Sequence, residues 1–166
     1  MKHILSIFIS VAMGALLCSC GVQKSQASYD FSSKVLSSNE DGSYVIRTQV
    51  RARNAVIAFT DAQRKVVKEV IFDGVQAGSN GIEALKPLCF DKNARAKHED
   101  YFNAFFADEG AWKQYASLKD KRLTTTTYAR NGKQMVETVT VTVNRAELKR
   151  KLQEDGIIPA QNMYQL

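Results

Sequence analysis

The sequence is poor in the residues that build most catalytic and metal sites, with two histidines and three cysteines among 166 residues. A Ser-His-Asp or Cys-His arrangement in the folded part would have to use His98, and no serine lies in a glycine-flanked nucleophile elbow. A metal site could use as ligands Cys89, Asp91, His98 and Asp100, but the spacings of these residues match no closed zinc pattern. We therefore expect no catalytic residue, no metal and no cofactor.

The sequence also lacks a hydrophobic run of transmembrane length and any block of five or more like charges. Its main apolar stretch, Ile4–Leu17, follows a short basic start. It falls short of the roughly 20 residues that cross a bilayer and is typical of a secretory signal. The net charge is +6, but acidic residues are interspersed among the basic ones, which disfavours nucleic-acid binding. A weak attraction to anionic lipid head groups or acidic cell-wall polymers fits this excess better.

A cysteine lies directly behind this apolar stretch, in the run Leu17-Cys18-Ser19-Cys20-Gly21. Leu17 is too large for the small-x-small site of an ordinary signal peptide. The run instead resembles a bacterial lipobox, which implies cleavage before Cys20 and acylation of that cysteine. The alternative is a plain secreted protein in which Cys20 is buried or forms a disulfide. With Cys18 removed and Cys20 acylated, Cys89 is left alone, so a disulfide framework within one chain is excluded.

These signals divide the chain into a signal peptide (1–19), a flexible lipid tether (20–29), a single domain (30–160) and a tail (161–166). The tether contains Lys24 and no acidic residue before Asp30. It therefore lacks the acidic tag associated with surface-exported lipoproteins of Bacteroidetes. We expect an outer-membrane lipoprotein that faces the periplasm.

The first half of the domain predicts a hairpin and a long helix. Two strands, 34–36 and 44–52, flank a turn at 39–42, and the second strand alternates apolar and polar residues. Asn54 is a candidate N-cap and Gly74 a candidate C′ residue for a helix of about 19 residues. Its apolar positions follow helical spacing, at Ala55, Val56, Phe59, Ala62, Val66, Val67, Val70 and Ile71. We expect this helix to be central to the core, and Phe59→Ala to cost about 3–5 kcal/mol if the Phe59 ring is fully buried.

The middle of the chain predicts a loop over 75–92, with one helical turn near 82–85, followed by helices over 93–106 and 111–118. These helices carry a dense group of aromatic residues. The group is either a binding patch or part of the core. Its members are Tyr101, Phe102, Phe105, Phe106, Trp112 and Tyr115.

The last third predicts a second hairpin and a short helix. Strands over 122–128 and 135–143 flank the turn dipeptide Asn131-Gly132. Asn144 and Glu147 then form a capping box for a helix that ends near Gly156. The fold class is therefore α+β: a two-layer arrangement with an antiparallel sheet of two hairpins, a long helix on one face and a helical aromatic insert.

Two segments carry a family resemblance. The sequence VTVTVNRAELKRKLQEDGII (139–158), together with the long helix from Ala55, resembles the small domain of LPP20-type lipoproteins and of the flagellar-assembly T lipoproteins. Pro87-Leu88 and EDYFNAFFADEG (99–110) resemble an uncharacterised lipoprotein family of gut Bacteroidetes. The resemblance implies an accessory or adaptor role in the envelope and brings no catalytic residues. The aromatic insert departs from the minimal form of that domain.

These observations favour a lipid-anchored, non-catalytic adaptor that binds an envelope protein or the cell wall. One alternative is a small-ligand carrier, with a pocket under loop 75–92. Another is a hydrolase that uses Cys89 and His98, which would have to lie within hydrogen-bond reach in a cleft.

Overall fold

The computed structural model describes residues 33–79, 81–120, 125–128 and 135–160. The signal peptide with Cys20, the tether, the turn dipeptide Asn131-Gly132 and the tail lie outside these residues. Among the helices that are described, none has both the length and the apolar character that a bilayer span needs.

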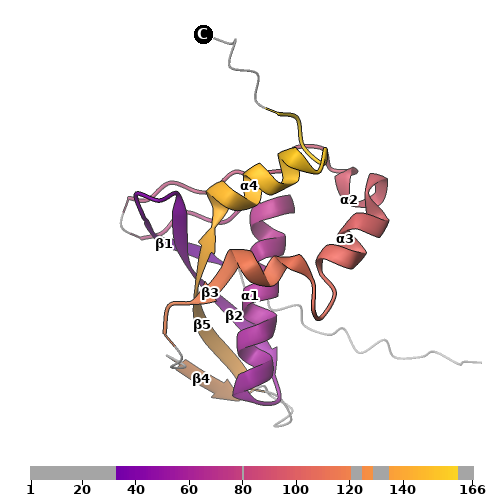
Figure 1. The fold of residues 1–166 in the computed structure, drawn as a ribbon. Helices are drawn as coiled ribbons and strands as arrows, with labels where there is room; N and C mark the ends of the chain where they lie inside the picture. Colours follow the sequence, from indigo (N-terminus) through magenta and orange to yellow (C-terminus); the bar gives the residue numbers. More distant parts are fainter. Residues whose placement is uncertain (1–32, 80, 121–124, 129–134, 161–166) are drawn as a thin grey trace, which may run out of the picture.

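A five-stranded antiparallel sheet forms one layer of the fold (Figure 1). β1 (Lys34–Ser38), β2 (Ser43–Ala52), β5 (Met135–Asn144) and β3 (Ala116–Leu118) lie in that order, and β4 (Thr125–Tyr128) also pairs with β5. β2 occupies one edge of β5 along all ten residues, so β3 and β4 share the other edge. The β1–β2 and β4–β5 pairings confirm the two predicted hairpins, and the α+β fold class is confirmed with them.

The predicted alternation places the apolar side chains of the two long strands on one face. Ile46 pairs with Val141 and Thr48 pairs with Val139, and all four residues are buried. The same face carries Glu137, which is 1% exposed and is the only charged residue among the described buried ones. Two faces of different polarity fix the register, because a shift by one residue would turn Val139, Val141 and Val143 outward.

The central helix α1 (Ala55–Phe72) packs against β2, β5 and β3. The Asn54 side chain accepts a hydrogen bond from the Ile57 N–H (3.0 Å), and Gly74 follows the helix with φ +80°. Both predicted ends are therefore confirmed. The residues that face the core are Ala58, Ala62, Val66, Val67, Val70 and Ile71.

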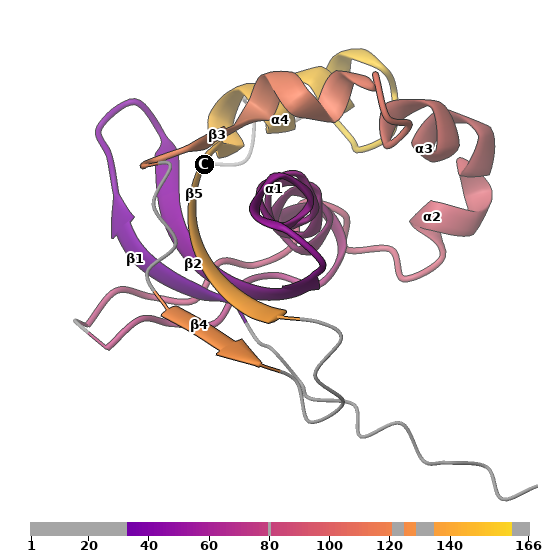
Figure 2. The same ribbon diagram turned by 90° about the horizontal axis from the view of Figure 1, so that it is seen from below.

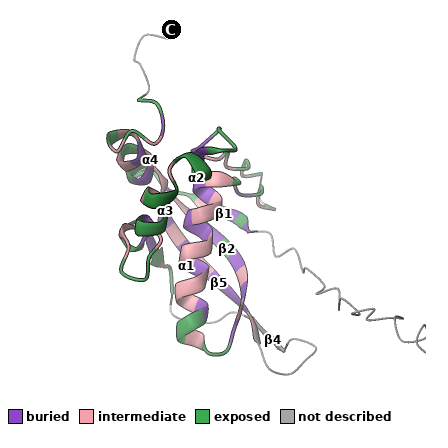
Figure 3. Ribbon diagram, turned by 90° about the vertical axis from the view of Figure 1, so that its right-hand side faces the viewer, coloured by how far each residue is buried: buried purple, intermediate pink, exposed green. Residues whose placement is uncertain are grey.

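Two predicted core positions of α1 are corrected. Val56 is 74% exposed, and Phe59 is only partly buried at the margin of the core. Both belong to the first two turns, whose start is exposed in Figure 3. The apolar spacing is continuous there, but the burial of Val56 would need an overlying element.

The middle of the chain differs from the prediction at three points. The helix expected over 93–106 is two, α2 (Ala94–Lys97) and α3 (Glu99–Phe105), with His98 between them at φ −122° and ψ 40°. The helix expected over 111–118 is a 3-10 helix, η1 (Ala111–Tyr115), followed by β3. Residues 116–118 fill the edge of β5 that β4 leaves open, so sheet pairing overrides the local helical pattern.

The third difference concerns loop 75–92. The helical turn expected near 82–85 is not formed, because Leu85 instead exchanges two backbone hydrogen bonds of 2.9 Å with Val75. The final helix, α4 (Arg145–Glu154), begins as predicted, with the Asn144 side chain accepting from the Glu147 N–H (3.1 Å). Figure 2 shows the sheet curved around α1, with α4 and α2–α3 along the other sides of the helix.

Candidate functional site

The aromatic group belongs mainly to the core. Phe102, Phe105, Trp112 and Tyr115 are 1–8% exposed, whereas Tyr101 and Phe106 are partly buried against them. The rings of Phe102 and Phe72 meet edge to face at 4.7 Å, which joins α3 to α1. The Trp112 indole N–H donates to the Ala107 carbonyl at 2.9 Å. This burial favours the core interpretation over the binding patch for the four enclosed rings.

The partly exposed Tyr101 has a structural contact of its own. Its hydroxyl donates to Asp155 Oδ2 (2.6 Å), and Lys151 donates to Asp155 Oδ1 (2.8 Å). Lys151 and then Tyr101 lower the pKa of Asp155, and burial followed by the Asp155 carboxylate raises the pKa of Tyr101. The contact ties α3 to the end of α4.

Loop 75–92 closes the C-terminal end of α1. The last carbonyls of a helix have no partner within it, and here the N–H groups of Leu88 and Cys89 donate to the carbonyls of Val70 (3.0 Å) and Ile71 (2.8 Å). The side chains of Val75, Leu88 and Cys89 are buried in the core. The loop thus contributes side chains of its own to the core, on the side where the carrier hypothesis places a ligand.

Cys89 and His98 have different surroundings. Cys89 is 5% exposed, and burial, followed by the charge of Asp91, raises the pKa of its thiol to about 11. The thiol is therefore protonated at neutral pH, whereas the nucleophile and metal ligand is the thiolate. His98 lies half-buried at the α2–α3 junction.

The proposed metal ligand Asp91 has other contacts. It accepts a hydrogen bond from the Asn93 N–H (2.8 Å) and pairs with Lys97 (2.6 Å), and these hydrogen bonds, the one from Lys97 foremost, lower its pKa. In the described ranges, no three His, Cys, Asp or Glu side chains lie close enough together to hold a metal ion.

A groove of about 530 Å³ runs along the outward side of α1 and the end of β2. Seven of its eight lining residues are charged, and five of these recur along α1 at spacings that place them on one helix surface. The lining consists of Val50, Arg51, Asp61, Arg64, Lys65, Lys68, Glu69 and Asp73. Figure 3 shows this side of α1 as partly exposed, beside the buried side that faces the sheet.

Two groove cations are engaged within the protein. Arg64 pairs with Asp108 (2.7 Å), and its guanidinium carbon lies 5.1 Å from the centre of the Trp112 ring. Lys65 donates to the Gln49 carbonyl (2.9 Å) and lies 3.7 Å from Glu69. Burial is the main cause that raises the pKa of Glu69. These contacts hold the two basic side chains along the helix.

Lys68 is different. Its ammonium lies 5.1 Å from the centre of the Phe106 ring, and no carboxylate in the described part of the chain lies within 4 Å of it. Burial lowers the pKa of Lys68, and the positive charges of Arg95 and Arg64 lower it further, whereas the negative charge of Asp61 acts in the opposite direction. A partly desolvated cation beside two others is a position at which an anionic group from a partner would be stabilised.

The sequence analysis placed no site here. Charges on the outer side of an amphipathic helix are the usual solvated surface, and locally only the opposite-charge i,i+4 pairs Asp61/Lys65 and Lys65/Glu69 distinguish this segment. The partners Asp108, Trp112 and Phe106 come from 38 to 48 residues further along the chain, counted from Arg64 and Lys68. Comparisons of the chain with known protein families, with curated proteins and with solved structures found no match.

Proposed function

We propose that the protein is a lipid-anchored, non-catalytic adaptor of the bacterial cell envelope, which binds an envelope protein or cell-wall polymer through the α1 groove. The observation that carries this proposal is the charged lining of the groove, with Lys68 lacking a described ionic partner. Polar rims and charged positions set the orientation and specificity of such contacts. A partner that presents a carboxylate or phosphate to Lys68 fits this surface.

The small-ligand carrier is the second candidate, and the groove supports it less well. Pockets that bury small ligands are lined mostly by apolar side chains, whereas Val50 is the only uncharged residue of this lining. The hydrolase is supported least, because a buried thiol with a raised pKa is a poor nucleophile. The resemblance to LPP20-type lipoproteins agrees with the adaptor role and stays a prediction.

The anchor is proposed from the sequence, at Cys20. A single acyl chain holds a protein only marginally, whereas several chains anchor it stably. We expect wild-type protein to partition into the detergent phase of an envelope extract and Cys20→Ser protein to be soluble or unprocessed. Equal partitioning of the two would refute the anchor. Protease shaving of intact cells tests the periplasmic orientation, in which the protein stays protected.

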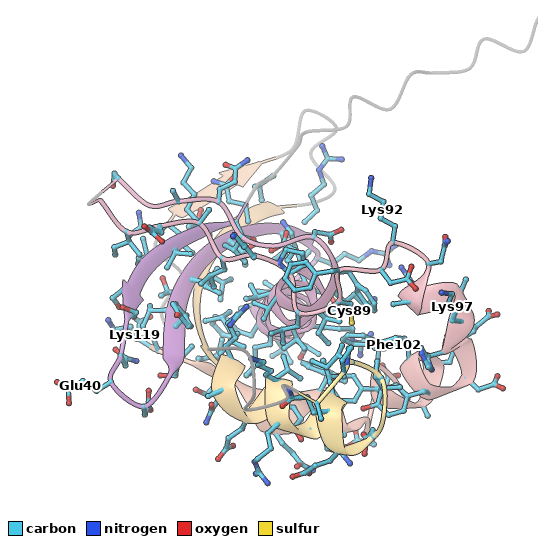
Figure 4. All side chains as sticks on the ribbon, turned by 90° about the horizontal axis from the view of Figure 1, so that it is seen from above. Glu40, Cys89, Lys92, Lys97, Phe102 and Lys119 are labelled. Carbon is cyan, nitrogen blue, oxygen red and sulfur yellow. The ribbon has the colours of Figure 1, made fainter. Side chains whose placement is uncertain are left out.

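Site-specific crosslinking tests the groove. A photoreactive residue replaces Asp61 inside the groove or, as a control, Glu40 in the exposed β1–β2 turn, which points away from the molecule in Figure 4. We expect a discrete crosslinked product in the native envelope from position 61 and none from position 40.

Charge reversal then tests Lys68 directly. Lys68→Glu should abolish the product from position 61, whereas Lys119→Glu, at an exposed lysine outside the groove, should leave it unchanged. Folding of both variants is checked by the fluorescence of the buried Trp112. A product that survives Lys68→Glu would contradict the groove as the binding site.

A further inference from the structure

We propose that a second surface, formed by Phe90, Lys92 and Arg95, rests on an anionic lipid bilayer and sets the orientation of the protein at the membrane. This Phe90 surface lies where loop 75–92 leads into α2. The inference rests on the lipid anchor of the proposed function in one respect, namely that the anchor brings the domain close to a bilayer.

Phe90 is exposed although the chain around it is fixed. Its side chain is 76% exposed, whereas the preceding Leu88 and Cys89 are each 5% exposed and donate backbone hydrogen bonds to the end of α1. After Phe90, the Asp91 side chain accepts from the Asn93 N–H at 2.8 Å. An aromatic side chain is therefore held outward between two hydrogen-bonded segments. Apolar side chains of this kind enter the boundary between lipid head groups and acyl chains.

The charge around Phe90 has the sign that an anionic bilayer attracts. Residues 86–98 contain the cations Lys86, Lys92, Arg95 and Lys97 and one acidic residue, Asp91, which Lys97 neutralises at 2.6 Å; Glu99 and Asp100 follow in the first turn of α3. Figure 4 shows Lys92 pointing away from the molecule. No described carboxylate lies within 4 Å of the Lys92 or Arg95 side-chain nitrogens.

A hollow of about 360 Å³ lies between these two cations. Its lining includes Lys92, Arg95, Asn93 and Asn103, together with the carboxylate of Glu99. Lysine and arginine bind phosphate oxygens through charge-assisted hydrogen bonds, and amide groups add neutral donors. The hollow therefore combines two cations and two amides that can bind the phosphate of a lipid head group with one carboxylate, and its Lys92 lies two residues from the exposed Phe90.

The point where the tether joins the domain favours a bilayer over a soluble protein as the occupant. Ser33, the first described residue, is hydrogen-bonded to loop 75–92, because its carbonyl accepts from the Gln76 N–H (3.2 Å). Twelve residues, which include most of the predicted tether (20–29), lie between Cys20 and Ser33, and a flexible chain of that length spans roughly 20 Å. The start of the loop that carries Phe90 is thus hydrogen-bonded to the first described residue after the tether.

Quenching of tryptophan by brominated lipids tests this surface. Full-length acylated protein is mixed with vesicles of brominated phosphatidylcholine, with or without phosphatidylglycerol. Phe90→Trp reports contact with the acyl chains, and Val56→Trp is the matched control, because Val56 is 74% exposed and lies near the other end of α1. The two ends of α1 are roughly 25 Å apart at 1.5 Å per residue. The native Trp112 is 1% exposed, so wild-type protein supplies the background.

We expect quenching of Phe90→Trp in vesicles with phosphatidylglycerol and no quenching of Val56→Trp above the wild-type background. In the Phe90→Trp protein, Lys92→Gln and Arg95→Gln should each lower the ratio of docked to undocked protein by about fivefold. Salt near 1 M, at which charges are screened within about 3 Å, should also lower the ratio of docked to undocked protein.

The inference is overturned if Phe90→Trp is no more quenched than Val56→Trp, as it would be if the surface bound a protein instead. Equal quenching with and without phosphatidylglycerol would also overturn it, because the cations would then be irrelevant. Flotation with pure phosphatidylcholine vesicles reports the anchor alone. Failure of the anchor and failure of the Phe90 surface are therefore distinguishable.

Discussion

The contact between Tyr101 and Asp155 is the sharpest test of how the helical insert is attached to the rest of the fold. Tyr101→Phe removes one hydroxyl from a partly buried ring and leaves the packing of α3 in place. A hydrogen bond to a charged group contributes about 1.5–3 kcal/mol. We expect Tyr101→Phe to lower the free energy of unfolding by about that amount at pH 7, because Asp155 is ionised there and, among the described residues, keeps only Lys151 as its partner.

The pH dependence of this loss follows from the direction of the pKa shift. The pKa of Asp155 is lowered in the folded protein, chiefly by Lys151 and then by Tyr101. The stability that the ionised carboxylate contributes is therefore fully present above its unfolded pKa of about 3.9 and is lost as the pH falls through the lower folded value. With Asp155 protonated, the hydroxyl meets a neutral group, and the cost of Tyr101→Phe should fall to about 0.5–1.5 kcal/mol.

Urea unfolding followed by Trp112 fluorescence measures both quantities, because Trp112 is the only tryptophan and is buried. A cycle with Asp155→Asn and the double variant isolates the pairwise coupling between the two side chains. A loss below about 0.5 kcal/mol at pH 7, or a loss that does not change between neutral and strongly acidic pH, would refute the charge-assisted hydrogen bond.

Three further predictions concern the core, the turns and the thiol. Ile71→Ala should cost about 2–5 kcal/mol because Ile71 is fully buried, whereas Val56→Ala should change stability by less than about 0.5 kcal/mol; urea unfolding compares them. Gly74→Ala should lower the free energy of unfolding more than Gly156→Ala does, by the same measurement. Both glycines have positive φ. An added Cβ at Gly74 would lie 2.5 Å from a carbonyl oxygen, whereas one at Gly156 meets nothing within 4 Å. Cys89 should react with a maleimide at neutral pH only at the rate at which the protein opens, because burial raises the pKa of its thiol to about 11; rapid labelling of the native protein would contradict this.

Local signals in the sequence were sufficient for the elements that carry their own end markers. Asn54 and Asn144 are N-caps whose side chains accept the expected backbone hydrogen bonds. The alternation in β2 and β5 matched the two faces of the sheet because these strands pair with each other along their whole length. Each of these signals is satisfied within a few residues or within one strand pair.

Signals that depend on distant partners were misleading. The helical pattern over 111–118 could not reveal that Ala116–Leu118 pairs with Val141–Val143. Helical spacing alone also could not distinguish Val56, which is exposed, from Ala58, which is fully buried. In both cases the deciding contact lies outside the window in which periodicity is read.

The sequence could predict only the residue types of the candidate site. Which of its basic residues can bind a partner depends on which charges are already neutralised within the fold. Arg64, Lys65 and Lys68 are equivalent basic residues in the sequence of an amphipathic helix. In the structure Arg64 pairs with Asp108 and Lys65 with Glu69, whereas Lys68 lies over the Phe106 ring and near the charge of Arg95. A reversal of charge at Lys68 removes a cation that has no described carboxylate within 4 Å. Lys68→Glu should therefore weaken binding of the partner and leave the free energy of unfolding nearly unchanged. A loss of stability without a loss of binding would mean that Lys68 stabilises α1 and does not belong to a binding site.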